Sequence, residues 1–465
     1  MQKIKLEKLF YNNKWQRPFS KKNYKFKTYE GTIIQIPKCN ELDTEICVKS
    51  ALDGLKKYKK LTNNQKSKIL EKISKKIKSL SNTLAYKECK ELGKTFQNAK
   101  KEMIACSKLW NHASKQVKKN KPKIIVKKKI RLHEYLEPVG VVALIIPWNF
   151  PMIVLSERLP YILAAGNSVI IKPSENGNLS IEYFIKILES QGFPKGVINF
   201  LPGDGLTGKY LVKNKNVSMI SFTGSTKTGK EIYSSSSSDI KRLSLELGGK
   251  NPMAIFNDAN FDSAANDIIY SFTHNAGQCC VSGSRLFIQK SSYKKFISIL
   301  LSKLNKIKQF QNTVTHIQYL RIKKIIRKSL KQKNTQVIYR KEKLFDDKKR
   351  VIYPIIFRPK NKNNLLNEEI FGPVLTVDIF ENLDDLVNKM NNTNYGLSAL
   401  IWTKDRQKGL QLASKLNSGR IWINGNISQN YPELSIGGFK ESGLNRETGE
   451  SGIITYSEKK SIILN

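Results

Sequence analysis

The residues most able to do chemistry in this chain are a thiol and a carboxylate, 34 positions apart. Cys280 ends the tripeptide Gln-Cys-Cys, and Glu246 stands between two leucines just before two glycines. A cysteine thiolate is accessible near neutral pH and strongly nucleophilic. A carboxylate in apolar surroundings has a raised pKa that suits a general base. At this spacing alone the two groups indicate little, and their chemistry has to be read together with the motifs around them.

Four further motifs flank this pair in the chain. They are Pro147–Pro151 (PWNFP), Lys172–Glu175 (KPSE), Phe222–Ser225 (FTGS) and Glu369–Pro373 (EIFGP). In this order, and over roughly residues 8–465, the motifs closely resemble those of the aldehyde dehydrogenase superfamily. The resemblance implies oxidation of an aldehyde to a carboxylic acid with NAD as cofactor.

The resemblance assigns three catalytic residues. Cys280 would be the nucleophile, with Cys279 a neighbour that takes no part in the chemistry. Asn149 and the backbone N–H of Cys280 would hold the developing oxyanion, because an amide donates without repelling negative charge. Glu246 would activate the water that hydrolyses the thioester, with Glu447 as a possible proton relay. Without the family, the alternatives are a pair of buried apolar thiols, a turn asparagine and an exposed glutamate.

The NAD site is expected on residues that follow strands. The resemblance places Lys172 and Glu175 at the adenosine ribose, where a carboxylate would repel a 2′-phosphate and favour NAD over NADP. The remaining predicted cofactor residues are Trp148, Gly224, Ser225, Glu369 and Phe371. Gly224 and Ser225 open a predicted helix, whose free N–H groups suit a pyrophosphate. Ser225 could instead only cap that helix, and Lys172 and Glu175 could lie in a solvated loop.

The substrate is the least determined feature of the sequence. The predicted tunnel residues are Phe150, Glu157, His274, Cys279, Val281 and Ile436. Relatives that oxidise betaine aldehyde hold its ammonium in an aromatic cage, to which only Phe150 corresponds here. Glu157 could attract a small cationic aldehyde, such as betaine aldehyde or an aminoaldehyde, or it could pair with Arg158 or Lys172. His274 is expected to be a wall residue.

The elements that position these residues alternate between strands and helices. Short β-branched runs such as 141–146 and 217–222 are separated by helical patterns, which predicts an α/β fold with parallel sheets. The resemblance implies two parallel-sheet α/β domains and a small β arm. The predicted NAD-binding domain covers 1–119 and 138–247, the catalytic domain 248–451, and the oligomerisation arm 120–137 and 452–465. Residues 453–464 could form a terminal strand that matches an exposed ribbon over 123–137. A homodimer or homotetramer is expected.

The net charge of +43 is the most unusual property of the composition. It raises the alternative of a basic nucleic-acid-binding protein that keeps the fold without turnover. Because the lysines are spread along the whole chain rather than gathered in one stripe, a nucleic-acid partner is not expected. The cysteines have no metal-ligand spacing and no secretory signal is visible, so a cytoplasmic protein without a metal is predicted. Two departures from the family pattern are a shortened segment at 309–315 and Asn445, which stands where the family usually has glycine. Because asparagine tolerates left-handed backbone better than most residues, Asn445 is expected to cause only a small perturbation.

Overall fold

The chain forms two compact units. The first unit comprises the N-terminal part up to Leu245, with Tyr431–Ile436 and Asn445–Asn465, and the second comprises Glu246–Asn430 and Gly437–Leu444. The computed structural model describes residues 2–128, 130–360 and 363–465. Residues 1, 129 and 361–362, which fall within the predicted cofactor domain, arm and catalytic domain, lie outside the described residues. The predicted domain boundaries stay a prediction.

A mixed sheet forms the centre of the first unit. Its order is β12-β11-β8-β9-β10-β2-β3, in which β8 pairs in parallel with both β9 and β11, and β10 with β9. The strands are β2 (Leu9–Tyr11), β3 (Lys14–Gln16), β8 (Val141–Ile146), β9 (Ser168–Pro173), β10 (Ile198–Phe200), β11 (Met219–Thr223) and β12 (Arg242–Glu246). Every residue of β8 and β9 is buried, as expected of parallel strands covered on both faces.

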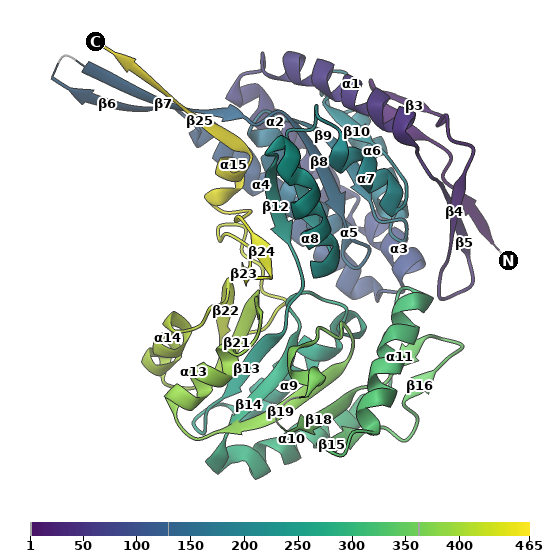
Figure 1. Cartoon of the computed structure of the whole chain (residues 1–465), viewed down its shortest axis with the longest axis vertical. Helices are drawn as coiled ribbons and strands as arrows, with labels where there is room; N and C mark the ends of the chain where they lie inside the picture. The colour runs from purple at the N-terminus through teal and green to yellow at the C-terminus, as the bar shows by residue number, and fades with distance from the viewer. Residues whose placement is uncertain (1, 129, 361–362) are drawn as a thin grey trace. The chain divides into compact units, whose positions relative to one another are not determined.

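Helices of the first unit connect and cover these strands (Figure 1). The N-terminal helices of this unit are α1 (Glu41–Tyr58), α2 (Asn63–Ser79), α3 (Ser81–Leu92) and α4 (Phe96–Lys119). The helices between strands are α5 (Pro151–Ala164), α6 (Leu179–Glu189), α7 (Gly205–Lys213) and α8 (Thr226–Ser236). A separate three-stranded sheet, in the order β1-β5-β4, consists of β1 (Lys3–Lys5), β4 (Asn23–Lys27) and β5 (Ile33–Pro37).

A three-stranded ribbon extends away from the helices of the first unit (Figure 1). Its order is β25-β7-β6, with β6 (Lys123–Lys127), β7 (Ile130–Pro138) and β25 (Ser457–Leu464) paired antiparallel. The sequence prediction of a strand over 453–464 was wrong at its start. A short helix, α15 (Ser451–Thr455), occupies that part of the chain, and Ile453 is buried there in the unit's interior.

The second unit is built on a seven-stranded sheet in the order β15-β18-β19-β14-β13-β21-β22. All its pairs are parallel except β15 with β18. The strands are β13 (Asn251–Ile255), β14 (Gly283–Gln289), β15 (Thr335–Arg340), β18 (Ile355–Pro359), β19 (Val374–Phe380), β21 (Ser398–Trp402) and β22 (Arg420–Ile423). Alternating strands and helices in both units confirm the predicted α/β class.

Helices of the second unit bury separate apolar clusters. One cluster joins the sheet to α9 (Phe261–Thr273) and α10 (Tyr293–Lys306), and another joins it to α13 (Leu383–Asn391) and α14 (Arg406–Ser414). A third lies between β18 and α11 (His316–Leu330). The shorter elements are α12 (Asn364–Asn367), β16 (Phe345–Asp346), β17 (Val351–Ile352), β20 (Tyr395–Gly396), β23 (Phe439–Lys440) and β24 (Gly443–Leu444).

Candidate active site

The predicted nucleophile follows a strained turn of the second unit. Cys279 and Cys280 lie between a 3-10 turn, His274–Gly277, and β14. Asn275 and Ala276 both have positive φ, 51° and 56°, and Gly277 follows with φ 71°. Left-handed backbone at a non-glycine residue costs roughly 1–3 kcal/mol and persists only where the surroundings hold it. The strain therefore indicates that this turn is shaped for the residues that follow it.

Hydrogen bonds from two other segments hold the cysteine loop. The side chain of Gln278 donates to the carbonyl of Asn275 (2.8 Å) and accepts from the backbone N–H of Val314 (3.1 Å). Asn251, at the start of β13, donates to the carbonyl of Cys280 (2.7 Å). Val314 belongs to the shortened segment 309–315, so this departure from the family pattern forms part of the support for the nucleophile loop.

The two glycines after Glu246 contact the cysteine loop and the motif Glu369–Pro373. Glu246 ends β12 and is buried. The N–H of Gly249 donates to Glu369 Oε1 (2.9 Å). A Cβ added at Gly248 would lie 2.4 Å from Glu369 Oε2, and one at Gly249 would lie 2.7 Å from the carbonyl oxygen of Cys280. Only glycine permits these approaches, which bring the three motifs together in one unit.

Glu369 and Phe371 lie in a segment that α11 holds from one side. Arg321 donates to the carbonyls of Glu369 (2.7 Å) and Ile370 (2.9 Å), and Gln318 donates to the carbonyl of Phe371 (3.1 Å). Phe371 has φ 56°, which is unusual for a bulky side chain. Burial raises the pKa of Glu369, against the N–H of Gly249 and nearby cations that lower it. A half-buried carboxylate and a phenylalanine with left-handed backbone thus stand at the positions predicted for the nicotinamide end.

Lys250 is a site residue that the sequence analysis missed. It directly follows the two glycines and is 1% exposed. Its Nζ has no hydrogen-bond partner among the described residues. Burial, with the nearby guanidinium of Arg285, lowers its pKa to about 7, although Glu369 acts in the opposite direction. Its place beside the Glu246 motif was the available signal, but the sequence does not show that this ammonium is buried.

In the first unit, the predicted oxyanion residue lies at a strand-to-helix junction. Trp148 and Asn149 follow β8, and Phe150 is the N-cap of α5, with Pro151 at its first position. Asn149 and Phe150 are buried, whereas Trp148 is half-buried. A proline pre-set for helical φ begins the helix sharply, which leaves these residues in the connection rather than inside α5.

Lys172 and Glu175 lie at and just after the end of β9. Lys172 Nζ donates to the carbonyls of Pro173 (2.8 Å) and Gly203 (2.9 Å). Burial lowers the pKa of Lys172, and Glu175 acts in the opposite direction. Because an ammonium has three N–H groups and two are used here, one remains to donate to a hydroxyl. This donor beside a half-buried carboxylate fits a ribose.

Ser225 is the N-cap of α8. Its Oγ accepts from the N–H of Thr228 (3.2 Å), so the capping alternative raised by the sequence is present. Gly224 precedes it at the end of β11. The cap places both residues at a helix N-terminus, and their contact with a pyrophosphate stays a prediction.

Glu157 is ion-paired in the first unit. Arg158, also on α5, contacts Glu157 Oε2 through Nη1 (3.2 Å) and Glu447 Oε2 through Nε (2.7 Å). The other oxygen of Glu447 accepts from Ser244 Oγ (2.6 Å) and from the hydroxyl of Tyr456 (2.9 Å). Of the two alternatives for Glu157, the structure contains the pairing with Arg158. The relay role of Glu447 stays a prediction.

Comparison with known proteins decides what these motifs belong to. The profile of the Aldehyde dehydrogenase family matches residues 20–462. The chain belongs to this family. The match confirms the predicted fold and the predicted enzyme class, an NAD-dependent aldehyde dehydrogenase.

Three similar proteins show how far the likeness extends. Aldehyde dehydrogenase [NAD(P)+] 2 of Saccharomyces cerevisiae is 34% identical over 92% of this chain and 89% of its own length. Betaine aldehyde dehydrogenase of Bacillus subtilis is 32% identical over 88% and 86%. The crystal structure of an NAD-dependent aldehyde dehydrogenase from Sinorhizobium meliloti superposes with a TM-score of 0.94 at 30% identity, covering 100% of this chain and 95% of that one.

Several residues of this aldehyde dehydrogenase that were predicted to line the tunnel make contacts within their own unit. His274 stacks on Tyr270, with ring centres 4.7 Å apart. Val281 packs against the apolar cluster of α9 and α10, and Cys279 is half-buried. Ile436 exchanges two backbone hydrogen bonds of 2.7 Å with Glu447. Their contact with an aldehyde stays a prediction.

Asn445 takes the left-handed backbone that its residue type tolerates. Its φ is 72°, and its side-chain amide donates to the carbonyl of Leu243 on β12. Asparagine therefore adopts here, at little cost, the left-handed conformation that suits glycine, as expected from the sequence.

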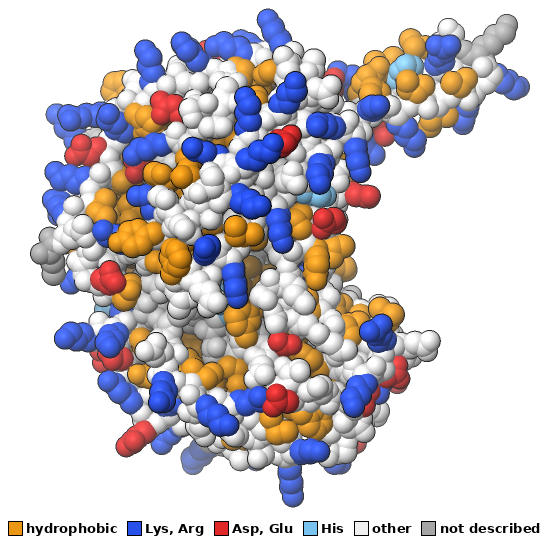
Figure 2. Space-filling view, turned by 180° about the vertical axis from the view of Figure 1, so that it is seen from behind, with side chains coloured by type: hydrophobic (Ala, Val, Ile, Leu, Met, Phe, Trp, Pro, Cys, Tyr) orange, Lys and Arg blue, Asp and Glu red, His pale blue; other side chains and the backbone are white. Residues whose placement is uncertain are grey.

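The basic side chains of this aldehyde dehydrogenase are spread over its surface. Figure 2 shows Lys and Arg scattered over the visible face and interspersed with acidic side chains, without one continuous basic stripe. Among the described residues, no helix is long and apolar enough to cross a membrane. Within the same residues, no group of three or more His, Cys, Asp or Glu side chains is arranged to hold a metal.

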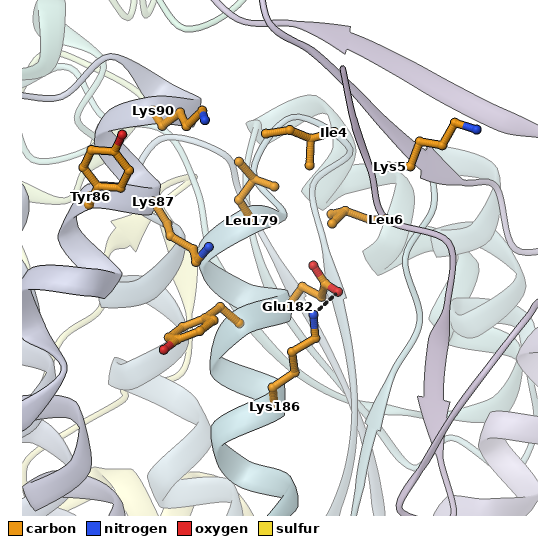
Figure 3. Close-up of a pocket in the computed structure, with 10 residues that line it drawn as sticks. Ile4, Lys5, Leu6, Tyr86, Lys87, Lys90, Leu179, Glu182 and Lys186 are labelled. Atoms are coloured by element: carbon orange, nitrogen blue, oxygen red, sulfur yellow. Dashed lines mark ion pairs between the residues drawn. The ribbon is translucent and has the colours of Figure 1, made fainter. Parts of the chain in front are cut away.

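A surface pocket of about 320 Å³ lies apart from these motifs in the first unit (Figure 3). It is lined by residues of β1, α3 and α6, four of them lysines. Lys186 pairs with Glu182 (2.8 Å), Lys87 lies over the ring of Tyr183 (4.9 Å), and Lys5 extends away from the other labelled side chains. These lysines do not converge on one point, so the pocket does not form a focused anion site.

Proposed function

We propose that this enzyme oxidises an aldehyde to a carboxylic acid by covalent catalysis at Cys280. The observation that carries the proposal is the convergence of the Glu246 motif, the Cys280 loop and Glu369 at two glycines, supported by the family match. Cys280 Sγ attacks the carbonyl carbon, and Asn149 with the N–H of Cys280 holds the resulting oxyanion. Loss of hydride from this tetrahedral carbon leaves a thioester on Sγ.

Hydrolysis then releases the product. Glu246 takes a proton from water, and the hydroxide formed attacks the thioester carbonyl. The carbon–sulfur bond breaks, giving a carboxylic acid and the Cys280 thiolate. Glu246 is buried next to Leu245 and Leu247, which supports a role inside the site rather than at the protein surface.

NAD would be held mainly by residues that lie in the connections next to strands. Bound NAD supplies the hydride acceptor. Lys172 and Glu175 would bind the adenosine ribose, and Ser225 and Gly224 the pyrophosphate. Glu369 and Phe371 would hold the nicotinamide ribose and ring, with Trp148 nearby. The remaining N–H of Lys172 beside Glu175 supports this assignment, and the carboxylate supports NAD over NADP.

A small cationic aldehyde, such as betaine aldehyde or an aminoaldehyde, is the proposed substrate. The carboxylates of Glu157, on α5, and of Glu447 share the single guanidinium of Arg158. The pair weakens the attraction that Glu157 could exert, but the cluster keeps a net negative charge that favours a cation. Similarity to the betaine aldehyde dehydrogenase of Bacillus subtilis supports the same class.

The β6-β7-β25 ribbon supports assembly into a homodimer or homotetramer. Ile124, Ile125 and Val126 on β6, and Ile463 on β25, are exposed, and Figure 2 shows hydrophobic side chains along the projecting ribbon. An exposed apolar sheet with two open edges is a typical association surface. The described residues contain no disulfide between the six cysteines, which supports a cytoplasmic location.

NADH absorbance with a panel of aldehydes tests the proposal. The panel pairs a cationic aldehyde with a neutral one of similar length, in the parent enzyme and in Glu157→Gln. If the parent enzyme produces no NADH with any aldehyde of the panel, the proposed function is overturned. An unchanged ratio of kcat/KM values in Glu157→Gln removes this residue from substrate selection. A salt-titrated nucleic-acid shift, run beside the panel, tests the alternative of a basic nucleic-acid-binding protein.

A further inference from the structure

Helix α3 carries two buried carboxylates that reach different helices. Glu88 and Glu91 are three positions apart, which places them on the same face of α3. Both are almost completely buried, at 0% and 1% exposure. Glu88 Oε1 accepts from the N–H of Met152 in the first turn of α5 (3.1 Å). The oxygens of Glu91 accept from Asn178 N (2.7 Å) and Leu179 N (3.0 Å), where α6 begins.

Neither of these helices is capped by its own N-cap side chain. The N-cap of α5 is Phe150, which has no oxygen in its side chain. The N-cap of α6 is Asn178, whose side-chain amide donates instead to the carbonyl of Ser174 (2.6 Å). The first N–H groups of a helix need acceptors, and its positive dipole end favours an anion. The two carboxylates of α3 therefore act as caps supplied from outside.

Lys94 links the first of these caps to the predicted aldehyde-binding segment. Gly93 ends α3 with φ 76°, and Lys94 follows it into the interior. Its Nζ contacts Glu88 Oε2 and Glu102 Oε2, each at 2.6 Å, and lies 4.4 Å from the centre of the Phe150 ring. Burial opposes a charge on Lys94, but the two carboxylates raise its pKa above the ordinary value. One buried ammonium thus contacts both the cap of α5 and the residue that begins it.

The two capped helices follow two different predicted binding motifs. Asn149 and Phe150 directly precede α5, and the ribose motif Lys172–Glu175 precedes α6 by three residues. We propose that Glu88 and Lys94 are positioning residues for Asn149 and Phe150, and that Glu91 is the corresponding positioning residue for the ribose motif. This inference rests on the proposed function, since it uses the roles given there to Asn149 and Glu175.

The proposal predicts that two nearly identical substitutions affect different steps, aldehyde oxidation in one variant and NAD binding in the other. Glu88→Gln leaves one acceptor oxygen for two donors, the N–H of Met152 and Nζ of Lys94, so one of these contacts is lost and the start of α5 is held less firmly. It should lower kcat and kcat/KM for the aldehyde at least tenfold, with the NAD dissociation constant within twofold of the parent. Glu91→Gln loses one of two N–H bonds to α6. It should raise the NAD dissociation constant at least fivefold, with kcat at saturating NAD within twofold.

The experiment uses the full-length enzyme and reads the two sites separately. NAD affinity is measured by quenching of protein fluorescence, the chemical step by the stopped-flow burst of NADH, and folding by thermal denaturation. Each Gln variant is the matched control of the other, because both replace a buried carboxylate on α3 that caps a helix. Lys94→Met should reproduce the aldehyde-side defect of Glu88→Gln and leave NAD affinity unchanged.

Two results would overturn the proposal. One is that both Gln variants change the same quantity, either kcat for the aldehyde or the NAD dissociation constant. The other is that both variants keep the kinetics of the parent and only their melting temperature is lower. If the Gln variants do not fold, Glu88→Asp and Glu91→Asp replace them, because aspartate keeps the charge on a shorter side chain. The same two quantities, kcat for the aldehyde and the NAD dissociation constant, are then compared. A parent without NADH production overturns the proposed function instead, and unchanged NAD affinity in the Glu91 variant then still overturns its half of this inference.

Discussion

Replacing Lys250 by methionine should change how the stability of the enzyme depends on pH. Lys250 is 1% exposed, and burial with Arg285 lowers its pKa to about 7. In the unfolded chain a lysine titrates at about 10.4. Between these values the unfolded chain binds more protons than the folded chain, so this group makes folding more favourable as pH rises. Below pH 7 the charged side chain is destabilising, and the cost is fully present.

The size of the effect follows from the separation of the two pKa values. It corresponds to roughly 5 kcal/mol across the whole interval. With an unfolding entropy of about 2.1 cal/mol/K per residue, this is a shift of about 5 °C for a chain of 465 residues. Lys250→Met removes the charge and keeps a side chain of similar length. The melting temperature of the parent relative to that of the variant should therefore rise by up to about 5 °C as pH increases through the whole interval.

Thermal denaturation of both proteins at pH 6.5, 8 and 9.5 measures this difference. The matched control is Lys241→Met, because Lys241 is also buried but donates to the carbonyls of Asn214 (2.7 Å) and Val217 (3.0 Å). Its loss should lower the melting temperature, since two carbonyls lose their donor. An offset between parent and Lys250→Met that stays constant at all three pH values would refute the reasoning about Lys250.

Cys280→Ala should abolish NADH production and leave NAD binding intact, whereas Cys279→Ala should retain most activity; equal losses in steady-state assays of both would reject the choice of nucleophile. Glu246→Gln should keep the stopped-flow burst of NADH but slow steady turnover by roughly two to four orders of magnitude, the usual contribution of a general base, so normal turnover would remove Glu246 from the mechanism. The parent should prefer NAD, and Glu175→Gln should narrow the gap in kcat/KM between NAD and NADP; comparable values for both cofactors in the parent would contradict the role of Glu175.

Local sequence was a good guide where function depends on a short segment. The strand-turn-helix context of Ser225 predicted a helix start, and the structure has Ser225 as the N-cap of α8. Asn445 was expected to tolerate left-handed backbone and has φ 72°. The strand predicted from residue 453 failed at its start, because burial of Ile453 in a short helix depends on distant packing rather than on local pattern.

The sequence by itself determined the family and the α/β class, because these follow from an ordered set of motifs and from the alternation of strand and helix patterns. Only the tertiary structure decided which charges meet. Glu88 and Glu91 cap helices 64 and 87 positions away in the chain. Arg158 forms ion pairs with both Glu157 and Glu447. Lys250 is buried. Burial and long-range pairing are properties of packing, and in a chain with 81 lysines and arginines nothing local distinguishes these few from the solvated majority.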